Sequence, residues 1–481
     1  MRAIKRAIKR QLTRRELMVA STVLAAGACA TTPAAEKSKA SVVVVGAGAA
    51  GLAAAHRLNK SGVRATIYEG SARVGGRVRT ETGLLAPGIV TELGAEFIDS
   101  DHHALLRLCT ELKLELDDVT VASEADLDDV FFFDGKRYGE DDVAAALAPL
   151  KARIDADLAR VGLDVDYRNP GQGVPLDDMN LVDYFAAIGA SGWFAKLLDV
   201  AFTTEFGLDL GEQSALNFLN IYKDGSMWGD SDERFKIRGG NQRVTDGLAA
   251  LLPAQLELEH KLLALHPSGS GYRLSFENGG TTKDVDADVV LLTLPFSCLR
   301  EVEITVPLPE VKKRSIAELG YGTNAKLMAG VQERTWRARG FSGGVLSDER
   351  FQLAWDSSRL QPGQKGALSM FTGGKAGVVV GEGTAETQVA QAWPGVVRAL
   401  GDVVRTGSSA RCHWPSDPWA RGSYACYRPG QWTRIAGVEG EPVGRLFFAG
   451  EHCSRVYQGF INGAVETGEL AADAIAKLLQ T

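Results

Sequence analysis

Cysteine is scarce in this sequence, with six residues in a chain of 481. That number is too small for a disulfide-built scaffold, and no CxxC pair or Cys/His spacing typical of a metal site occurs, so we expect no metal. An excess of positive charge is also lacking, because 53 Lys and Arg stand against 60 Asp and Glu. The net charge of −7 argues against nucleic acid as a partner.

Long apolar runs are missing too, and the nearest candidate belongs to an export signal. Residues 1–15 carry seven basic side chains, and an apolar stretch, residues 17–30, follows directly. That stretch is shorter than the roughly 20 residues a membrane span needs. Arg14–Arg15 in TRRELM is typical of a twin-arginine signal, so we expect residues 1–30 to direct the protein to the periplasm. Cleavage after Ala30 and lipidation of Cys29 are both open, and residues 31–37 form a linker.

Glycine is abundant, with 54 residues, and its most informative cluster follows a run of valines. Residues 42–45 predict a buried parallel strand, and the loop after it, Gly46-Ala-Gly48-Ala-Ala50-Gly51, opens an Ala/Leu-rich helix. A second strand ends at Glu69, which can bind a ribose hydroxyl. Such a strand, glycine loop, helix and acid predict a dinucleotide site with the phosphates at the helix N-terminus.

A second glycine cluster follows that acid directly. Arg73, Gly75, Gly76 and Arg77 offer another close backbone approach, with cationic side chains for the same pyrophosphate. By itself this could be a surface loop.

Together these motifs resemble the opening of the flavin-containing amine oxidase superfamily, which includes monoamine, polyamine and L-amino-acid oxidases. The resemblance covers nearly all of the chain after residue 38. It implies an α/β fold with a discontinuous Rossmann-like FAD-binding domain, residues 38–115, 235–300 and 411–481. It also implies an α+β substrate-binding domain, residues 116–234 and 301–410.

Three further segments carry the resemblance and place more of the chain at FAD. Residues 91–99 (TELGAEFID) would run beside the flavin ring, residues 255–265 would pass the adenine, and the strand and helix of 444–452 and 459–479 would form the last FAD motif. The implied cofactor contacts in these segments are Gly94, Ala95, Glu96, Phe97, Leu262, Gly450, Glu451, Phe460 and Ile461.

One lysine stands out within a small, apolar strand pattern, residues 322–331 (GTNAKLMAGV). Alternation puts Ala325, Leu327, Ala329 and Val331 on one face and Lys326 on the other. Taken alone, Lys326 could be a solvated residue of a half-exposed strand. The resemblance instead implies the family's lysine beside the flavin, which assists the reaction with oxygen.

The resemblance also implies the walls of the substrate pocket. Trp414 would pack near the flavin, and Tyr424 and Phe460 would be the two aromatic walls beside the substrate amine. Trp419 and Tyr457 are interpreted as core aromatics. Ser423 stands where monoamine oxidases carry the cysteine that bonds to FAD. Because serine cannot form that thioether, we expect FAD to be bound non-covalently. Cys426 is three positions away and is expected to be buried.

The predicted reaction oxidises a primary amine, diamine or polyamine to an imine and then an aldehyde, with O2 reduced to H2O2. Glu96 and Asp99 near the entrance would suit a cationic amine, although Glu96 could equally serve only to order the loop. An L-amino-acid oxidase, an amine dehydrogenase, a desaturase and a catalytically inactive flavin-binding envelope protein remain alternatives. Substrate identity and oligomeric state are left open.

The rest of the chain gives a coarse pattern. Helices are expected at 101–114, over most of 141–222 with breaks at Pro170 and Pro175, and near 385–400. Hairpins are expected at 129–139 and 272–295, and strands at 324–332, 351–357 and 366–372.

Overall fold

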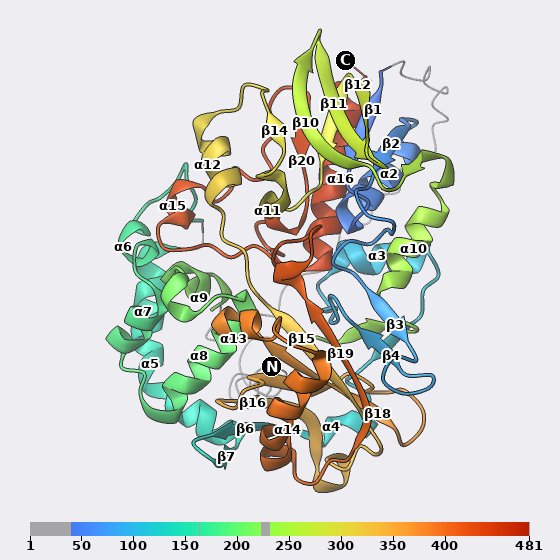
Figure 1. Cartoon of the computed structure of the whole chain (residues 1–481). Helices are drawn as coiled ribbons and strands as arrows, with labels where there is room; N and C mark the ends of the chain where they lie inside the picture. The colour runs from blue at the N-terminus through green and yellow to red at the C-terminus, as the bar shows by residue number, and fades with distance from the viewer. Residues whose placement is uncertain (1–39, 163, 223–230, 481) are drawn as a thin grey trace, which may run out of the picture.

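The computed structural model describes residues 40–162, 164–222 and 231–480 (Figure 1). The predicted export signal, the linker and Cys29 lie outside these residues. No helix within the described ranges is both long and apolar enough to cross a membrane.

A five-stranded parallel sheet forms one half of the molecule. Its order is β20 (Leu446–Phe448), β13 (Val289–Leu292), β1 (Val42–Val45), β2 (Ala65–Tyr68) and β9 (Leu256–Glu257). The central strand is fully buried, as its four valines predict. Helices α2 (Ala49–Lys60) and α16 (Ile461–Leu478) pack against each other beside this sheet, with α3 (His103–Glu111) and α10 (Gln242–Ala250) near them (Figure 1).

A smaller sheet extends from the parallel one. It contains β12 (Thr281–Ala287), β11 (Gly271–Asn278), β10 (Lys261–Ser268) and β14 (Glu303–Ile304), and its long hairpin rises at the top of Figure 1. The short helices α11 (Phe296–Leu299) and α12 (Glu310–Glu318) follow β13 along the chain.

The other half is built on a seven-stranded sheet that contains the lysine strand. Its order is β19 (Arg405–His413), β15 (Ala325–Val331), β18 (Gly366–Thr372), β17 (Leu353–Asp356), β16 (Phe341–Ser347), β6 (Asp128–Phe133) and β7 (Lys136–Tyr138). Two small pairs, β3 (Thr80–Thr82) with β4 (Val90–Glu92) and β5 (Leu116–Asp118) with β8 (Phe235–Ile237), complete the sheets.

Helices cover this second half. They are α4 (Ala122–Ala125), α5 (Glu140–Val161), α6 (Val174–Asp177), α7 (Leu181–Ile188), α8 (Gly192–Phe206), α9 (Ala215–Ile221), α13 (Gly374–Val379), α14 (Ala385–Leu400) and α15 (Gln431–Arg434). Helices α5 to α9 gather at the left of Figure 1, where their apolar side chains share one core with the far face of the parallel sheet.

The predicted α/β class is confirmed. The segments of the parallel sheet, 42–68, 256–292 and 446–448, all fall in the stretches assigned from sequence to the FAD-binding domain. β14 pairs with β10, and β5 with β8, across the assigned boundaries. The exact division into domains stays a prediction.

Two strands of the seven-stranded sheet, β16 and β19, were not foreseen from the sequence. Gly343 and Gly344 weaken the strand pattern of β16, yet both are required there. A Cβ on Gly344 would lie 2.3 Å from the Asp129 carboxylate, and one on Gly343 would lie 2.9 Å from the Trp336 indole. Close side chains from neighbouring segments, invisible in the local pattern, explain both glycines.

Candidate functional site

The glycine loop between β1 and α2 forms a cradle of backbone. Gly46 has φ +106°, and a Cβ on Gly51 would lie 2.0 Å from the Gly46 carbonyl oxygen, so both positions need glycine. Gly48 is the N-cap of α2 and makes no side-chain capping bond. Nothing lies within 4 Å of a Cβ placed on Gly48, which leaves open space above the first turn of the helix. Unsatisfied amides and the positive end of the helix dipole face this space, as an anion site requires.

Glu69 and the second glycine pair close this cradle from the side. One carboxylate oxygen of Glu69 accepts from the Ala47 N–H at 2.7 Å, and the other accepts from the Ser71 N–H and hydroxyl. The buried carboxylate retains lone pairs for a ribose hydroxyl. Gly75, with φ +99°, bridges to Gly48 and so brings the two glycine motifs side by side.

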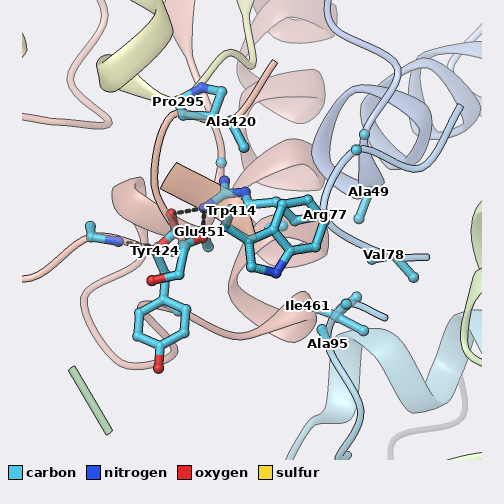
Figure 2. A pocket seen from close by; sticks show the side chains of 18 of the residues that line it. Ala49, Arg77, Val78, Ala95, Pro295, Trp414, Ala420, Tyr424, Glu451 and Ile461 are labelled. Atoms are coloured by element: carbon cyan, nitrogen blue, oxygen red, sulfur yellow. Dashed lines mark hydrogen bonds and ion pairs between the residues drawn. The ribbon is translucent and has the colours of Figure 1, made fainter. Parts of the chain in front are cut away.

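Two arginines supply positive charge along the cradle. The Arg73 guanidinium donates to the carbonyls of Val74 and Gly76, and burial lowers its pKa. Arg77 donates to the Ser423 carbonyl and to the Glu451 carboxylate, both at 2.7 Å. Burial alone would lower the pKa of Arg77, but the adjacent Glu451 carboxylate raises it, so the guanidinium stays charged. Figure 2 shows this pair beside Trp414.

The last strand and helix of the chain complete the same region. Gly450 follows β20, and Glu451 also accepts from the Gly459 N–H at 2.9 Å. Phe460 is the N-cap of α16 and Ile461 its first residue, again without a side-chain cap. Gly468 lets α16 approach α2, since a Cβ there would lie 2.3 Å from the Ala50 carbonyl. The two helix N-termini are thereby held on the same cavity.

These segments border one cavity of about 560 Å³. It runs from the glycine loop and Leu262, called here the cofactor end, past residues 94–97 and Lys326 to Tyr424, Trp355 and Phe371, called here the substrate end. Figure 2 shows Ala49, Val78, Ala95 and Ile461 on one side of this cavity. On the other side, it is bordered by Trp414 and Tyr424. The cofactor and catalytic residues predicted from sequence all line this cavity except Gly51, which packs against Gly46 behind the loop; the predicted entrance acid Asp99 does not line it either.

Lys326 lies at the junction of the two ends. It is 4% exposed, and all seven residues of β15 are buried between β18 and β19, so the interpretation of a solvated lysine is wrong. Its ammonium donates to the carbonyls of Glu92 and Gly94 at 3.1 and 2.8 Å and to the Glu96 carboxylate at 2.8 Å. It also lies 5.2 Å from the centroid of the Trp355 ring. These contacts fix a charged group at the cavity wall.

Glu96 has a second cation that sequence analysis missed. Lys236, on β8, donates to the other Glu96 oxygen at 2.6 Å. Burial alone would raise the pKa of Glu96, but the ammonium groups of Lys236 and Lys326 lower it below its ordinary value. The Glu96 charge is therefore fully compensated and does not present a free acid to an incoming amine. Only the pairing of segments 140 residues apart in the chain reveals Lys236.

Asp99 also differs from the expectation of an acid near the entrance. It does not line the cavity, and its carboxylate accepts from the N–H groups of Asp232 and Glu233, tying down that loop. Two other acids, Glu205 and Glu233, do line the cavity.

The predicted aromatic residues lie around the cavity. Tyr424 donates through its hydroxyl to the Thr204 carbonyl at 2.9 Å, and burial raises its pKa well above the ordinary value, so it stays protonated. Trp414 is buried in the same apolar cluster as Met328, a residue of β15. Phe460 packs edge-on to His102, with ring centroids 5.1 Å apart. The walls predicted from sequence are thus apolar and neutral.

Trp419 is not a core aromatic, contrary to the interpretation from sequence. Trp419 is 40% exposed and lines the cofactor end, and a Cβ on Gly70 would lie 2.3 Å from its indole. Tyr457 is half-buried and does not line the cavity; its hydroxyl donates to the Asp101 carbonyl. The exposed loop of 417–421 explains why an apolar residue could be misassigned to the core.

Ser423 and Cys426 lie as the sequence predicts. The Ser423 hydroxyl donates to the Asn324 side-chain oxygen at 2.6 Å beside the cavity. Cys426 is fully buried, does not line the cavity, and accepts from the Asn217 amide, while burial raises its thiol pKa above the ordinary value.

Sequence analysis also missed most of the substrate end. Leu353, Trp355 and Phe371 come from β17 and β18, and Phe371 is the cross-strand neighbour of both Lys326 and Leu353. Helices α8 and α9 and the segment after Tyr424 contribute further lining at this end: Thr204, Glu205, Phe206, Asn217, Asn220, Ile221, Tyr427 and Trp432. The available signal in the sequence was an aromatic residue, Trp355 or Phe371, on each of the strands expected at 351–357 and 366–372.

The cofactor end fits FAD by its own geometry. This end has a glycine loop whose open space a Cβ would fill, two uncapped helix N-termini, a carboxylate at the end of β2 and two arginines. A flavin adenine dinucleotide needs these groups for its pyrophosphate and ribose.

Comparisons with known proteins agree with this geometry. A family model of flavin-containing amine oxidoreductases matches residues 49–476. An L-amino acid dehydrogenase from Synechocystis sp. is 25% identical over 472 residues, covering 92% of this chain and 96% of that protein. The flavin-containing amine oxidase B of Sus scrofa is 26% identical over 468 residues, covering 91% and 86%. The structure of cyclohexylamine oxidase from Brevibacterium oxydans IH-35A superposes with a TM-score of 0.81 at 24% identity, over 92% of this chain and 100% of that one.

Proposed function

The chain belongs to the flavin-containing amine oxidoreductase family, and we propose that it oxidises a primary amine, diamine or polyamine with O2 as electron acceptor. The amine, O2 and water would give the aldehyde, ammonia and H2O2. The observation that carries this proposal is a buried, charged Lys326 between a cofactor end that fits FAD and an aromatic substrate end. Bound FAD would supply the two-electron chemistry at the carbon beside the amine nitrogen.

The chain's own residues would bind and orient the amine. Tyr424, Trp355 and Phe371 offer ring faces that exclude water and favour the neutral amine over the ammonium ion. The Lys326 ammonium would itself be a proton donor at the boundary between the two ends.

Among the lining residues that the structure describes, none at this end is a free cation for a substrate carboxylate. Among the described lining residues there, the Lys326 ammonium is bonded to Glu96 and two carbonyls, and Arg455 is paired with Asp166. These pairings favour an amine over an amino acid.

FAD bound non-covalently is part of the same proposal. Ser423 supplies no thiol, and Cys426 is buried away from the cavity. Acid precipitation of the yellow protein should leave the flavin in the supernatant. Flavin that stays with the precipitated protein would show a covalent bond.

The second candidate is an L-amino acid dehydrogenase, favoured by the similarity to the Synechocystis protein. Matched substrate pairs that differ only in a carboxylate separate the two: cadaverine with L-lysine, and phenethylamine with L-phenylalanine. Our proposal expects oxygen uptake and peroxide with the amine of each pair. Turnover of the amino acid with an artificial dye and no peroxide would favour the dehydrogenase, and no turnover of any compound would favour a non-catalytic flavoprotein.

We also propose export by the twin-arginine route, because that route carries folded proteins already loaded with cofactor. Replacing Arg14 and Arg15 with lysine should retain the protein in the cytoplasm. Fractionation of cells would test this, and Cys29→Ser would show whether membrane association depends on lipidation. Unchanged periplasmic recovery of the Arg14→Lys/Arg15→Lys variant would contradict the proposal.

A further inference from the structure

Three charged side chains meet beneath the middle of the cavity. Glu96 lies between Lys326 and Lys236, with its oxygens 2.8 and 2.6 Å from the two ammonium nitrogens. The side chains are 2%, 5% and 12% exposed for Glu96, Lys326 and Lys236, so the group is largely out of water. With one carboxylate and two ammonium groups, its formal charge is +1.

Neutrality would have required only one lysine. Lys326 alone compensates the negative charge of Glu96. Burying the ammonium group of Lys236 as well has a cost in desolvation free energy, which its ion pair with Glu96 must offset. Lys236 makes one ion pair and lies 5.0 Å from the Phe97 ring centroid. It does not line the cavity, whereas Glu96 and Lys326 do, so Lys236 can act on the cavity only by holding Glu96 and by the field of its charge.

The surrounding titratable groups do not cancel this charge. Burial raises the pKa of the Glu92 carboxyl to about 7, so this group is largely neutral in mild acid. Burial also raises the pKa of the Cys412 thiol on the neighbouring strand to about 11. Asp356, which the charge of Lys236 also reaches, has its pKa raised by burial. A positive centre thus persists beside the cavity wall.

We propose that Lys236 and Glu96 are positioning residues that fix Lys326 and set the electrostatic potential felt by the flavin at this wall. This inference rests on the proposed function insofar as it needs FAD in the cavity, but it does not need the amine. Lys236 keeps the group at +1 and so favours electron uptake by the cofactor. Glu96 holds both lysines apart and prevents their repulsion from displacing Lys326.

The charge count gives the test a direction. Glu96→Gln leaves two cations and should raise the midpoint potential of the bound flavin. Lys236→Met leaves a neutral pair and should lower it, while Lys236→Arg should restore the wild-type value. The potentials are measured on FAD-loaded protein by dye-equilibrated chemical reduction at pH 6, where free ammonium groups are charged and the Glu92 carboxyl is largely protonated.

A matched control lies elsewhere in the same chain. Glu124 is equally buried, at 2% exposure, and bridges Arg337 and Arg359 without lining this cavity. Glu124→Gln removes the same charge from a similar group, so it should lower thermal stability and leave the potential unchanged.

The outcomes are distinct from those of the substrate screen. Opposite shifts for Glu96→Gln and Lys236→Met, with recovery in Lys236→Arg, support the proposal. Shifts of the same sign, or shifts no larger than that of Glu124→Gln, overturn it and leave the group a structural one. If Glu96→Gln does not retain FAD, the Lys236→Met and Lys236→Arg pair decides alone. A protein that binds FAD but oxidises no amine would refute the proposed function without affecting this test.

Discussion

The two ends of the cavity are built in different ways. The cofactor end is mostly backbone: glycines at the carboxyl end of one strand, two helix N-termini and a second glycine pair beside them. The substrate end is mostly side chain, with aromatics and charges contributed by strands β15, β17 and β18 and by helices α8 and α9. Backbone geometry leaves little freedom to the residue type, whereas side-chain walls can change and still leave the cavity in place. The cofactor end should therefore be intolerant of substitution and the substrate end tunable.

The largest effect is expected at Gly51. Gly51→Ala would place a methyl group 2.0 Å from the Gly46 carbonyl, which forces the strand–helix turn apart. Such overpacking costs about 1–3 kcal/mol and should abolish FAD retention. The flavin-to-protein absorbance ratio and thermal unfolding report both.

Gly48→Ala is the matched comparison for that prediction. Its Cβ would meet no protein atom within 4 Å and would instead occupy the space above the helix N-terminus. The apoprotein should unfold at the wild-type temperature yet retain less FAD. Equal loss of apoprotein stability in both variants would contradict this division of roles.

A smaller but specific effect is expected where the two ends meet. Lys326→Met should leave FAD bound and slow reoxidation of the reduced protein by O2 on the order of 100-fold, the scale of a lost charged donor. Stopped-flow mixing of reduced protein with oxygenated buffer measures this rate.

Lys312→Met provides the control. Lys312 is equally buried and donates to the carbonyls of Val438 and Glu439, but it does not line the cavity. The Lys312→Met variant should be less stable than the wild type and should be reoxidised at the wild-type rate. Unchanged reoxidation in Lys326→Met would break the assignment of this lysine.

The buried Glu92 carboxyl, close to Lys326, predicts that stability depends on pH. The folded-state pKa of Glu92 is raised by burial from 4.5 to about 7, so folding takes up a proton between these values. The free energy of unfolding of the apoprotein should therefore fall as pH rises from about 4.5 to about 7, by on the order of 1–3 kcal/mol. Chemical denaturation across this range should show a shallower slope for Glu92→Gln; an identical slope would contradict the assignment.

The smallest effect is expected at the substrate end. Tyr424→Phe keeps the ring and removes one hydroxyl bond to the Thr204 carbonyl, worth about 1 kcal/mol. Stability should fall by that amount, and kcat/KM for an amine should change by less than about 10-fold. Tyr457→Phe, outside the cavity, should leave kcat/KM unchanged. A complete loss of turnover in Tyr424→Phe would show that the hydroxyl itself takes part in the reaction.

The same contrast decides what could be predicted from the sequence. Gly46, Gly48, Glu69 and the strand and helix around them lie within 30 residues, so their spacing carries the whole motif. Lys236, Lys326 and Glu96 are far apart in the chain, and no local pattern shows that both lysines bind Glu96. The glycine-rich β16 was missed for a related reason, because Asp129 and Trp336 impose its glycines from other segments.

The expectation for Asp99 failed for a different reason. A carboxylate near an entrance suggests a free charge, but buried acids have partners, and Asp99 accepts from the backbone N–H groups of Asp232 and Glu233, more than 130 residues away in the chain. Sequence alone gives the charge of a side chain but not its compensation.

The most direct test of the account is an anaerobic titration of the purified yellow protein with a primary amine. If the protein is an amine oxidase, the flavin's visible absorbance should fall in proportion to the amine added. The absorbance should return when air is admitted, with one H2O2 formed for each flavin. Absorbance that stays unchanged with monoamines, diamines and polyamines alike would contradict it.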